Sequence, residues 1–84
     1  MKIAFNVCRN ELGECSDKEY VRYKEAVKSA LEAEFPGAKI TVGDSGFANV
    51  SQRYVTDYEE DTLEIVLAVD RIANEIFESG VWWD

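Results

Sequence analysis

The sequence contains no histidine, one proline and two cysteines among its 84 residues. Without histidine, neither a Ser-His-Asp nor a Cys-His arrangement for nucleophilic catalysis can be assembled. Two thiols without histidine make a poor zinc set, and the glycine-containing segment 43–46 lacks the lysine of a phosphate-binding P-loop. We therefore predict that the protein is not an enzyme and uses no cofactor or metal.

Long hydrophobic runs are also missing from the sequence. No stretch approaches the roughly 18 apolar residues that cross a bilayer, and residues 1–7 lack the hydrophobic region and cleavage site of a signal peptide. We therefore expect a cytoplasmic protein without membrane contact. Because the cytoplasm keeps thiols reduced, Cys8 and Cys15 should be free; in an oxidising compartment a disulfide between them is the alternative.

Basic residues are scarce in the second half of the chain. Residues 1–40 hold seven acidic and seven basic residues, whereas residues 41–84 hold ten acidic residues and only Arg53 and Arg71. The net charge of −8 therefore lies entirely in the second half. This imbalance argues against contact with nucleic acid or an anionic membrane, and it predicts a protein partner with a basic surface.

The first half of the chain predicts a strand followed by a helix. Apolar and polar residues alternate over 2–8, which is typical of a strand whose inner face carries Ile3, Phe5 and Val7. Ser16 and Glu19 form a capping box that begins a helix, and Pro36 with Gly37 ends it. The apolar stripe of this helix is Tyr20, Tyr23, Val27, Ala30 and Leu31.

The second half predicts two strands and a long helix. We expect strands over 39–42 and within 47–54, paired as a hairpin, with Ala48 and Val50 facing inward. Thr56 and Glu59 repeat the capping-box pattern and should begin a helix that ends near Ser79 and Gly80. The order β-α-β-β-α then predicts one α+β domain over residues 1–84, with both helices on one face of a small three-stranded sheet.

The last helix is predicted to present two contrasting faces. Its core seam consists of Ile65, Val69, Ile72 and Ile76. The opposite face carries an acidic row over about five turns, formed by Glu60, Glu64, Glu75 and Glu78. Such a face can simply be solvated. The row is nearly single-signed, however, whereas the first helix mixes both signs, and this difference favours use of the row by a partner.

Exposed apolar side chains are the second candidate feature of the last helix and the tail. Leu67 interrupts the acidic row together with Arg71, and we interpret Leu67 as a possible anchor for a partner. Of Trp82 and Trp83, one should pack on the domain because aromatic rings bury a large area. The other is a candidate anchor, since tryptophan is enriched among interface hot spots.

Several segments resemble, in the same order, the DinI-like family of RecA modulators. Glu-Phe-Pro is similar to the family's Ala-Phe-Pro at the end of the first helix. Glu-Ile-Phe-Glu-Ser with a trailing Trp is similar to its Glu-Thr-Trp-Glu-Ser. The matching positions are residues 1–3, 34–36, 48–50, Thr56 with the acids after it, and 75–79 with Trp83. The resemblance covers most of the chain except residues 9–15.

The resemblance implies that the last helix docks in the groove of a RecA filament, where its carboxylates meet basic groups that otherwise serve DNA or a repressor. Such docking would modulate the SOS response to DNA damage, by stabilising the filament or by restraining repressor self-cleavage. The candidate partner-binding residues are Glu60, Asp61, Glu64, Leu67, Asp70, Glu75, Glu78 and Trp83. We expect a monomer, with a homodimer through Trp82 and Trp83 as the alternative.

Two other functions fit the same acidic face. A phage-type inhibitor that imitates DNA would use it against a host nuclease or a defence complex, as an anti-CRISPR or anti-restriction protein. In an enzyme subunit or a plain structural domain the acids would serve only solubility.

Overall fold

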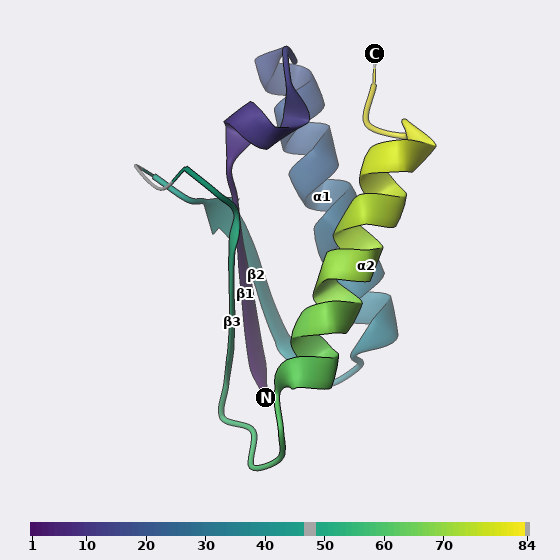
Figure 1. The fold of residues 1–84 in the computed structure, drawn as a ribbon. Helices are drawn as coiled ribbons and strands as arrows, with labels where there is room; N and C mark the ends of the chain where they lie inside the picture. The colour runs from purple at the N-terminus through teal and green to yellow at the C-terminus, as the bar shows by residue number, and fades with distance from the viewer. Residues whose placement is uncertain (47–48, 84) are drawn as a thin grey trace.

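The computed structural model describes residues 1–46 and 49–83 and has the predicted order β-α-β-β-α. Both helices cover the same face of a three-stranded mixed sheet, which confirms the two-layer α+β fold (Figure 1). The main elements are β1 (Lys2–Val7), α1 (Asp17–Glu34), β2 (Lys39–Asp44), β3 (Gln52–Thr56) and α2 (Leu63–Ser79). A short 3-10 helix, η1 (Arg9–Leu12), lies within the predicted polar loop and buries Leu12.

β1 is the central strand, parallel to β2 and antiparallel to β3. Ile3 pairs with Ile40 on one side and with Val55 on the other. The predicted hairpin is wrong, because β2 and β3 lie at opposite edges of the sheet; a helical crossover returns the chain parallel to β1, and β3 then takes the remaining edge. Val50 precedes β3 and is exposed, whereas Ala48 lies outside the described residues.

α1 begins and ends where the sequence predicts. The backbone N–H of Glu19 donates to Ser16 Oγ at 3.1 Å, and the backbone N–H of Ser16 donates to Glu19 Oε1 at 2.9 Å. This reciprocal capping box satisfies two amides that the helix leaves unpaired. At the other end the Phe35 N–H bonds to the Leu31 carbonyl at 2.9 Å. Pro36 follows, so the helix does not continue.

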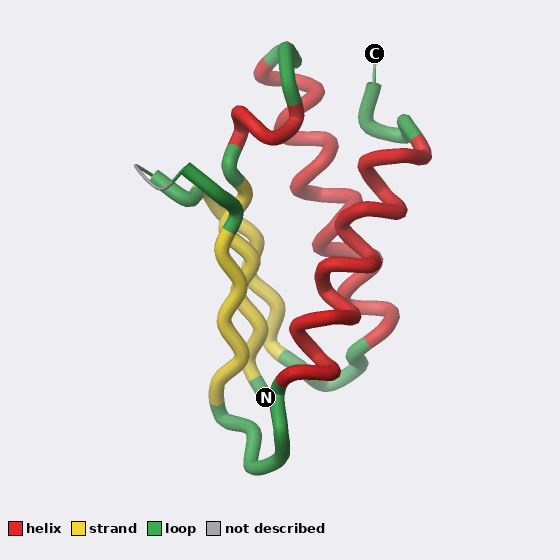
Figure 2. Tube along the Cα trace, viewed as in Figure 1, coloured by secondary structure: helices red, strands yellow, loops and turns green. Residues whose placement is uncertain are grey.

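α2 begins later than predicted, and Thr56 does not cap it. Thr56 is the last residue of β3, where its backbone belongs to the ladder with β1. Residues 57–62 form a loop that extends past the end of the sheet before the chain turns into the helix (Figure 2). Thr62 makes no side-chain cap; instead the Asp61 carboxylate accepts the backbone N–H of Leu63 at 3.0 Å.

The core lies between the inner face of β1 and the two helices. Its fully buried side chains come from β1, α1 and α2: Ile3, Val7, Val27, Leu31 and Val69. The predicted seam of α2 is confirmed, since Ile65, Val69 and Ile72 are buried and Ile76 packs against them. Burying each such side chain contributes about 1.5–3 kcal/mol. This anchoring fixes which face of α2 points outward.

Candidate functional site

The acidic residues predicted to form one row occupy two separate places. Three of them lie on α2 and are exposed: Glu64, Glu75 and Glu78. Glu60 and Asp61 lie in the loop before the helix. The first two glutamates of α2 are about 16 Å apart along the helix axis, and Leu67 and Arg71 occupy the interval. The interruption at Leu67 and Arg71 is as predicted, but the prediction that Glu60 belongs to the helical row is wrong, because α2 begins only at Leu63.

Four carboxylates gather where the loop meets α2, and we call them the acidic end: Glu59, Glu60, Asp61 and Glu64. All four residues are exposed. The neighbouring Tyr58 hydroxyl donates to Glu60 Oε2 at 3.3 Å. The charge of Glu60 is the main cause of a raised pKa at Tyr58, and the charge of Glu64 adds to it. Loop and helix therefore bring their negative charges to one place.

Basic side chains do not compensate the acidic end. Four acids of the second half form ion pairs: Asp44 with Lys24, Asp57 with Lys2, Asp70 with Arg53, and Glu75 with Arg71. In residues 1–46 and 49–83, no ion pair joins a basic side chain to the acidic end or to Glu78. Both arginines of the second half are thus paired within the domain, and the uncompensated charge of its described residues lies at the two ends of α2.

Arg71 divides the outer face of α2 electrostatically. Its guanidinium contacts Glu75 one turn further along at 3.2 Å and Glu34 of α1 at 3.5 Å. Exposed pairs of this kind contribute only about 0–1 kcal/mol to stability. Their effect on the surface charge is larger, because the single positive charge of Arg71 is shared between Glu75 and Glu34 and partly compensates both.

Asp70 is a predicted partner-binding residue that the structure places elsewhere. It lies on the flank of α2 that faces β3, where its carboxylate pairs with the Arg53 guanidinium. Both side chains are about one-third exposed, at 33% for Asp70 and 34% for Arg53. Asp70 therefore joins the helix to the sheet and does not belong to the outer acidic surface.

Exposed apolar side chains flank the acids of α2. Leu63 and Leu67 are 58% and 56% exposed and lie one turn apart beside Glu64. In the tail, Gly80 ends the helix in the left-handed region, and Trp82 folds back into the core with 2% exposure while Trp83 remains 59% exposed. The expectation that one tryptophan packs on the domain is confirmed.

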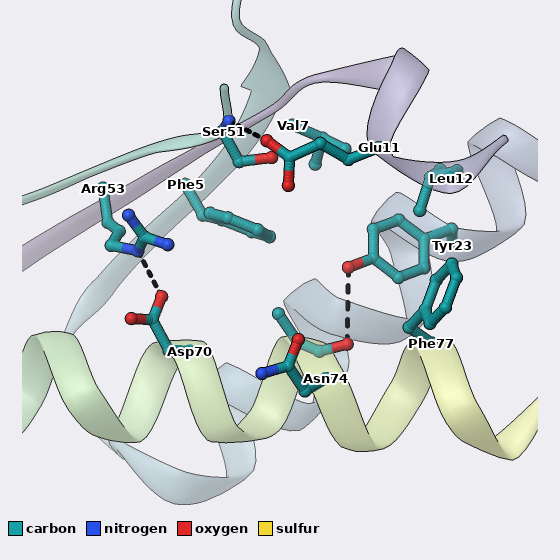
Figure 3. Close-up of a pocket in the computed structure, with 11 residues that line it drawn as sticks. Phe5, Val7, Glu11, Leu12, Tyr23, Ser51, Arg53, Asp70, Asn74 and Phe77 are labelled. Carbon is teal, nitrogen blue, oxygen red and sulfur yellow. Dashed lines mark hydrogen bonds and ion pairs between the residues drawn. The ribbon is translucent and has the colours of Figure 1, made fainter. Parts of the chain in front are cut away.

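A pocket of about 270 Å³ lies between α2, η1 and the inner face of β1 and β3 (Figure 3). Phe5, Tyr23 and Phe77 supply aromatic walls. The Arg53–Asp70 pair borders the pocket on one side, and the exposed Asn74 lies further along α2. The volume is many times the roughly 30 Å³ that one water takes in the liquid, so it can hold more than a trapped solvent molecule.

Glu11, an exposed residue of η1, contributes a carboxylate to the wall of this pocket. One carboxylate oxygen accepts the backbone N–H of Ser51 at 2.5 Å, and Figure 3 shows the other oxygen directed into the open space. The Ser51 hydroxyl in turn accepts the backbone N–H of Cys8 at 2.9 Å. Burial raises the pKa of Tyr23 to about 12, and the charge of Glu11 adds to this shift. The carboxylate and the phenol therefore face the same space.

The sequence carries few signals for this pocket. Glu11 stands in a polar segment without periodicity, and only the fold brings it to Ser51, forty positions later. The alternation in β1 does predict that Phe5 faces inward, and the helical stripe does the same for Tyr23. Nothing in the pattern indicates that space remains between them.

Metal-binding groups, disulfides and membrane-spanning helices are the other features that could indicate a function. Among the described residues, no group of histidine, cysteine, aspartate or glutamate side chains could hold a metal ion. Cys8 and Cys15 are not joined by a disulfide. Within the part of the chain that the structure covers, no helix combines the length and the apolar character that crossing a bilayer requires.

No model of a protein family matches the chain, and no curated protein matches its sequence. The resemblance to the DinI-like family therefore stays a prediction, and the function must be argued from the surface and the pocket.

Proposed function

We propose that the protein is a small acidic regulator that acts in the cytoplasm by binding RecA filaments through α2 and the loop before it. In this way it modulates the SOS response. The observation that carries the proposal is the set of carboxylates without basic partners at the acidic end and at Glu78, held on a helix whose opposite face is anchored in the core.

The surface suits a basic protein partner for two reasons. Uncompensated carboxylates attract a positively charged groove over long range and raise the rate of association. The exposed Leu63 and Leu67 lie on either side of Glu64 along α2, and they supply apolar surface that a partner can exclude from water. The charges then determine orientation, while the leucines and Trp83 contribute buried area.

Docking of this kind affects a filament by competition. The groups in a RecA groove that bind DNA or a repressor are basic, and the acidic end would occupy them with carboxylates. Because the acids lie at the two ends of α2, about 21 Å separates Glu64 from Glu78 along the helix axis. The helix would therefore make two charged contacts, with Leu67 between them and Leu63 beside the first.

Co-sedimentation with RecA filaments tests this function. We expect the protein to pellet with filaments at about 50 mM salt and to be largely released at about 300 mM, because screening weakens contacts between exposed charges. A protein that stays in the supernatant at both concentrations, or that pellets equally at both, contradicts the proposal.

The DNA-mimic function requires the same acids and a different target. Capture of partners from a bacterial lysate separates the two functions, since recovery of a nuclease or a defence complex without RecA would favour the inhibitor. The plain structural role predicts that charge reversal at the acidic end changes no binding activity.

A further inference from the structure

The pocket of Figure 3 has the size of a single side chain. Its volume of about 270 Å³ is just below the roughly 300–1,000 Å³ of sites that bury a drug-sized ligand. A nucleotide or a large cofactor does not fit such a space. An occupant of a few heavy atoms does, and it would enter at the open side of the pocket, which is lined by the exposed Glu11, Arg53 and Asn74.

The charges around the pocket favour a cation. Glu11 contributes one negative charge, and its only described partner is the neutral backbone N–H of Ser51. Arg53 and Asp70 neutralise each other at the border. The lining thus has a net charge of −1 within a chain of net charge −8, and an anion would meet two carboxylates here.

The aromatic walls favour a flat cation over a compact one. Phe5, Tyr23 and Phe77 present rings to the same space as the free oxygen of Glu11 (Figure 3). A guanidinium group stacks on aromatic rings and donates several parallel hydrogen bonds to a carboxylate, whereas an ammonium group is a strongly hydrated point charge. We propose that the pocket binds the guanidinium group of an arginine side chain that the protein partner presents.

The position of the pocket connects it to the surface of α2. Leu63, Leu67, Asp70, Asn74 and Phe77 recur every three or four residues and so follow one flank of the helix. The first two lie on the proposed docking surface, and the last three line the pocket. A partner seated on the leucines can therefore insert a side chain beside Asn74. The identity of the natural occupant rests on the proposed function, whereas the affinity of the pocket for a guanidinium does not.

Titration with n-propylguanidinium, which is the arginine side chain from Cβ outward, tests this inference without the partner. We expect saturable chemical-shift changes in the amide spectrum of the ¹⁵N-labelled protein at Phe5, Ser51 and Phe77. The dissociation constant should be about millimolar, as suits so few atoms. The neutral isostere n-propylurea should bind at least about tenfold more weakly, since the hydrogen bond to the carboxylate loses its charge. n-Butylammonium, the lysine analogue, should also bind more weakly.

Three variants test whether propylguanidinium binds in this pocket and through the charge of Glu11. Glu11→Gln keeps an oxygen for the Ser51 N–H but removes the charge, and it should weaken propylguanidinium binding about tenfold. Glu14→Gln makes the same charge change at an exposed position outside the pocket and should alter binding less than about twofold. Asn74→Phe should abolish binding by placing a ring across the entrance, and because Asn74 is exposed the fold should survive.

Equal binding of n-propylurea, shift changes at other residues, or an unaltered affinity of Glu11→Gln would overturn the inference. The two proposals fail separately. Loss of propylguanidinium binding with intact binding to RecA removes only the arginine pocket, and a working pocket in a protein that ignores RecA filaments removes only the proposed function.

Discussion

Arg53 on β3 and Asp70 on α2 form an ion pair that connects the outer strand to the second helix. α2 otherwise packs mainly on α1, and its apolar seam belongs to the common core. The pair also borders the pocket. It therefore keeps β3 and α2 together on the side of the pocket that a partner would approach. The charge pattern predicts that Asp70 binds a partner, whereas in the structure Asp70 joins α2 to β3.

Removing this pair should destabilise the protein modestly. Because both side chains are about one-third exposed, solvent screens the interaction, and we expect Asp70→Asn to lower the free energy of unfolding by about 1 kcal/mol. Urea titration followed by circular dichroism measures the change. Glu75→Gln, which removes the more exposed pair with Arg71, is the matched control and should cost less than about 0.5 kcal/mol. Equal effects of the two variants would show that Asp70 has no special role.

Stability should fall at alkaline pH because of the buried tyrosines. Burial raises the pKa of Tyr23 to about 12, above the value of about 10 in an unfolded chain. The folded state therefore holds this proton more tightly, and the associated stability is complete below pH 10 and is lost as the pH rises towards 12. At pH 11 the loss should be about 1 kcal/mol. Burial also raises the pKa of Tyr20, so its contribution has the same sign.

Urea midpoints at pH 8, 10 and 11 measure this dependence. Tyr23→Phe keeps the ring and removes the titrating group together with a long hydrogen bond of 3.4 Å to the Ala73 carbonyl. This variant should show a flatter decline between pH 10 and 11 than the unchanged protein. The same slope in both proteins would contradict the assignment to Tyr23.

Truncation of the two adjacent tryptophans should destabilise the protein to very different extents. Trp82 is 2% exposed, stacks with Phe77 and meets Tyr23 edge-on, so Trp82→Ala should cost about 3–5 kcal/mol. Trp83→Ala should cost less than about 1 kcal/mol, because the ring is mostly in solvent and meets the buried Trp82 only edge-on. Thermal unfolding compares the variants, and acrylamide should quench the fluorescence of Trp83 much more than that of Trp82. Similar losses from both truncations would contradict the packing of the tail.

Local patterns in the sequence predict the elements of this fold, but they do not predict how the strands pair. The alternation in β1, the Ser16 capping box and the seam of α2 each depend on neighbouring residues, and the structure confirms them. Strand order depends on competition for the edges of β1. Because proximity along the chain favours β2 and β3 as partners of each other, the pattern alone leads to the wrong pairing.

The same distinction applies to the candidate site. Thr56 and Glu59 match the capping-box pattern of a helix start. In the structure, however, Thr56 pairs with Lys2 of β1 as the last residue of β3. The acidic residues that follow Thr56 therefore lie in a loop. Exposure of Glu64, Leu67 and Glu78 follows from the position of the seam and is predictable. The ion pair of Asp70 with Arg53 and the position of Glu11 beside Ser51 are not predictable, since each depends on a contact between distant segments.

The most direct measurement compares two double charge reversals in co-sedimentation with RecA filaments at low salt. Glu64→Lys/Glu78→Lys and the control Glu25→Lys/Glu32→Lys on α1 both replace exposed acids, and both change the net charge from −8 to −4. If α2 and its acidic end bind the filament, the first variant should lose at least about 90% of its binding while the control keeps most of it. Equal losses would show that only net charge matters, and no loss in either would show that the acids of α2 do not bind RecA.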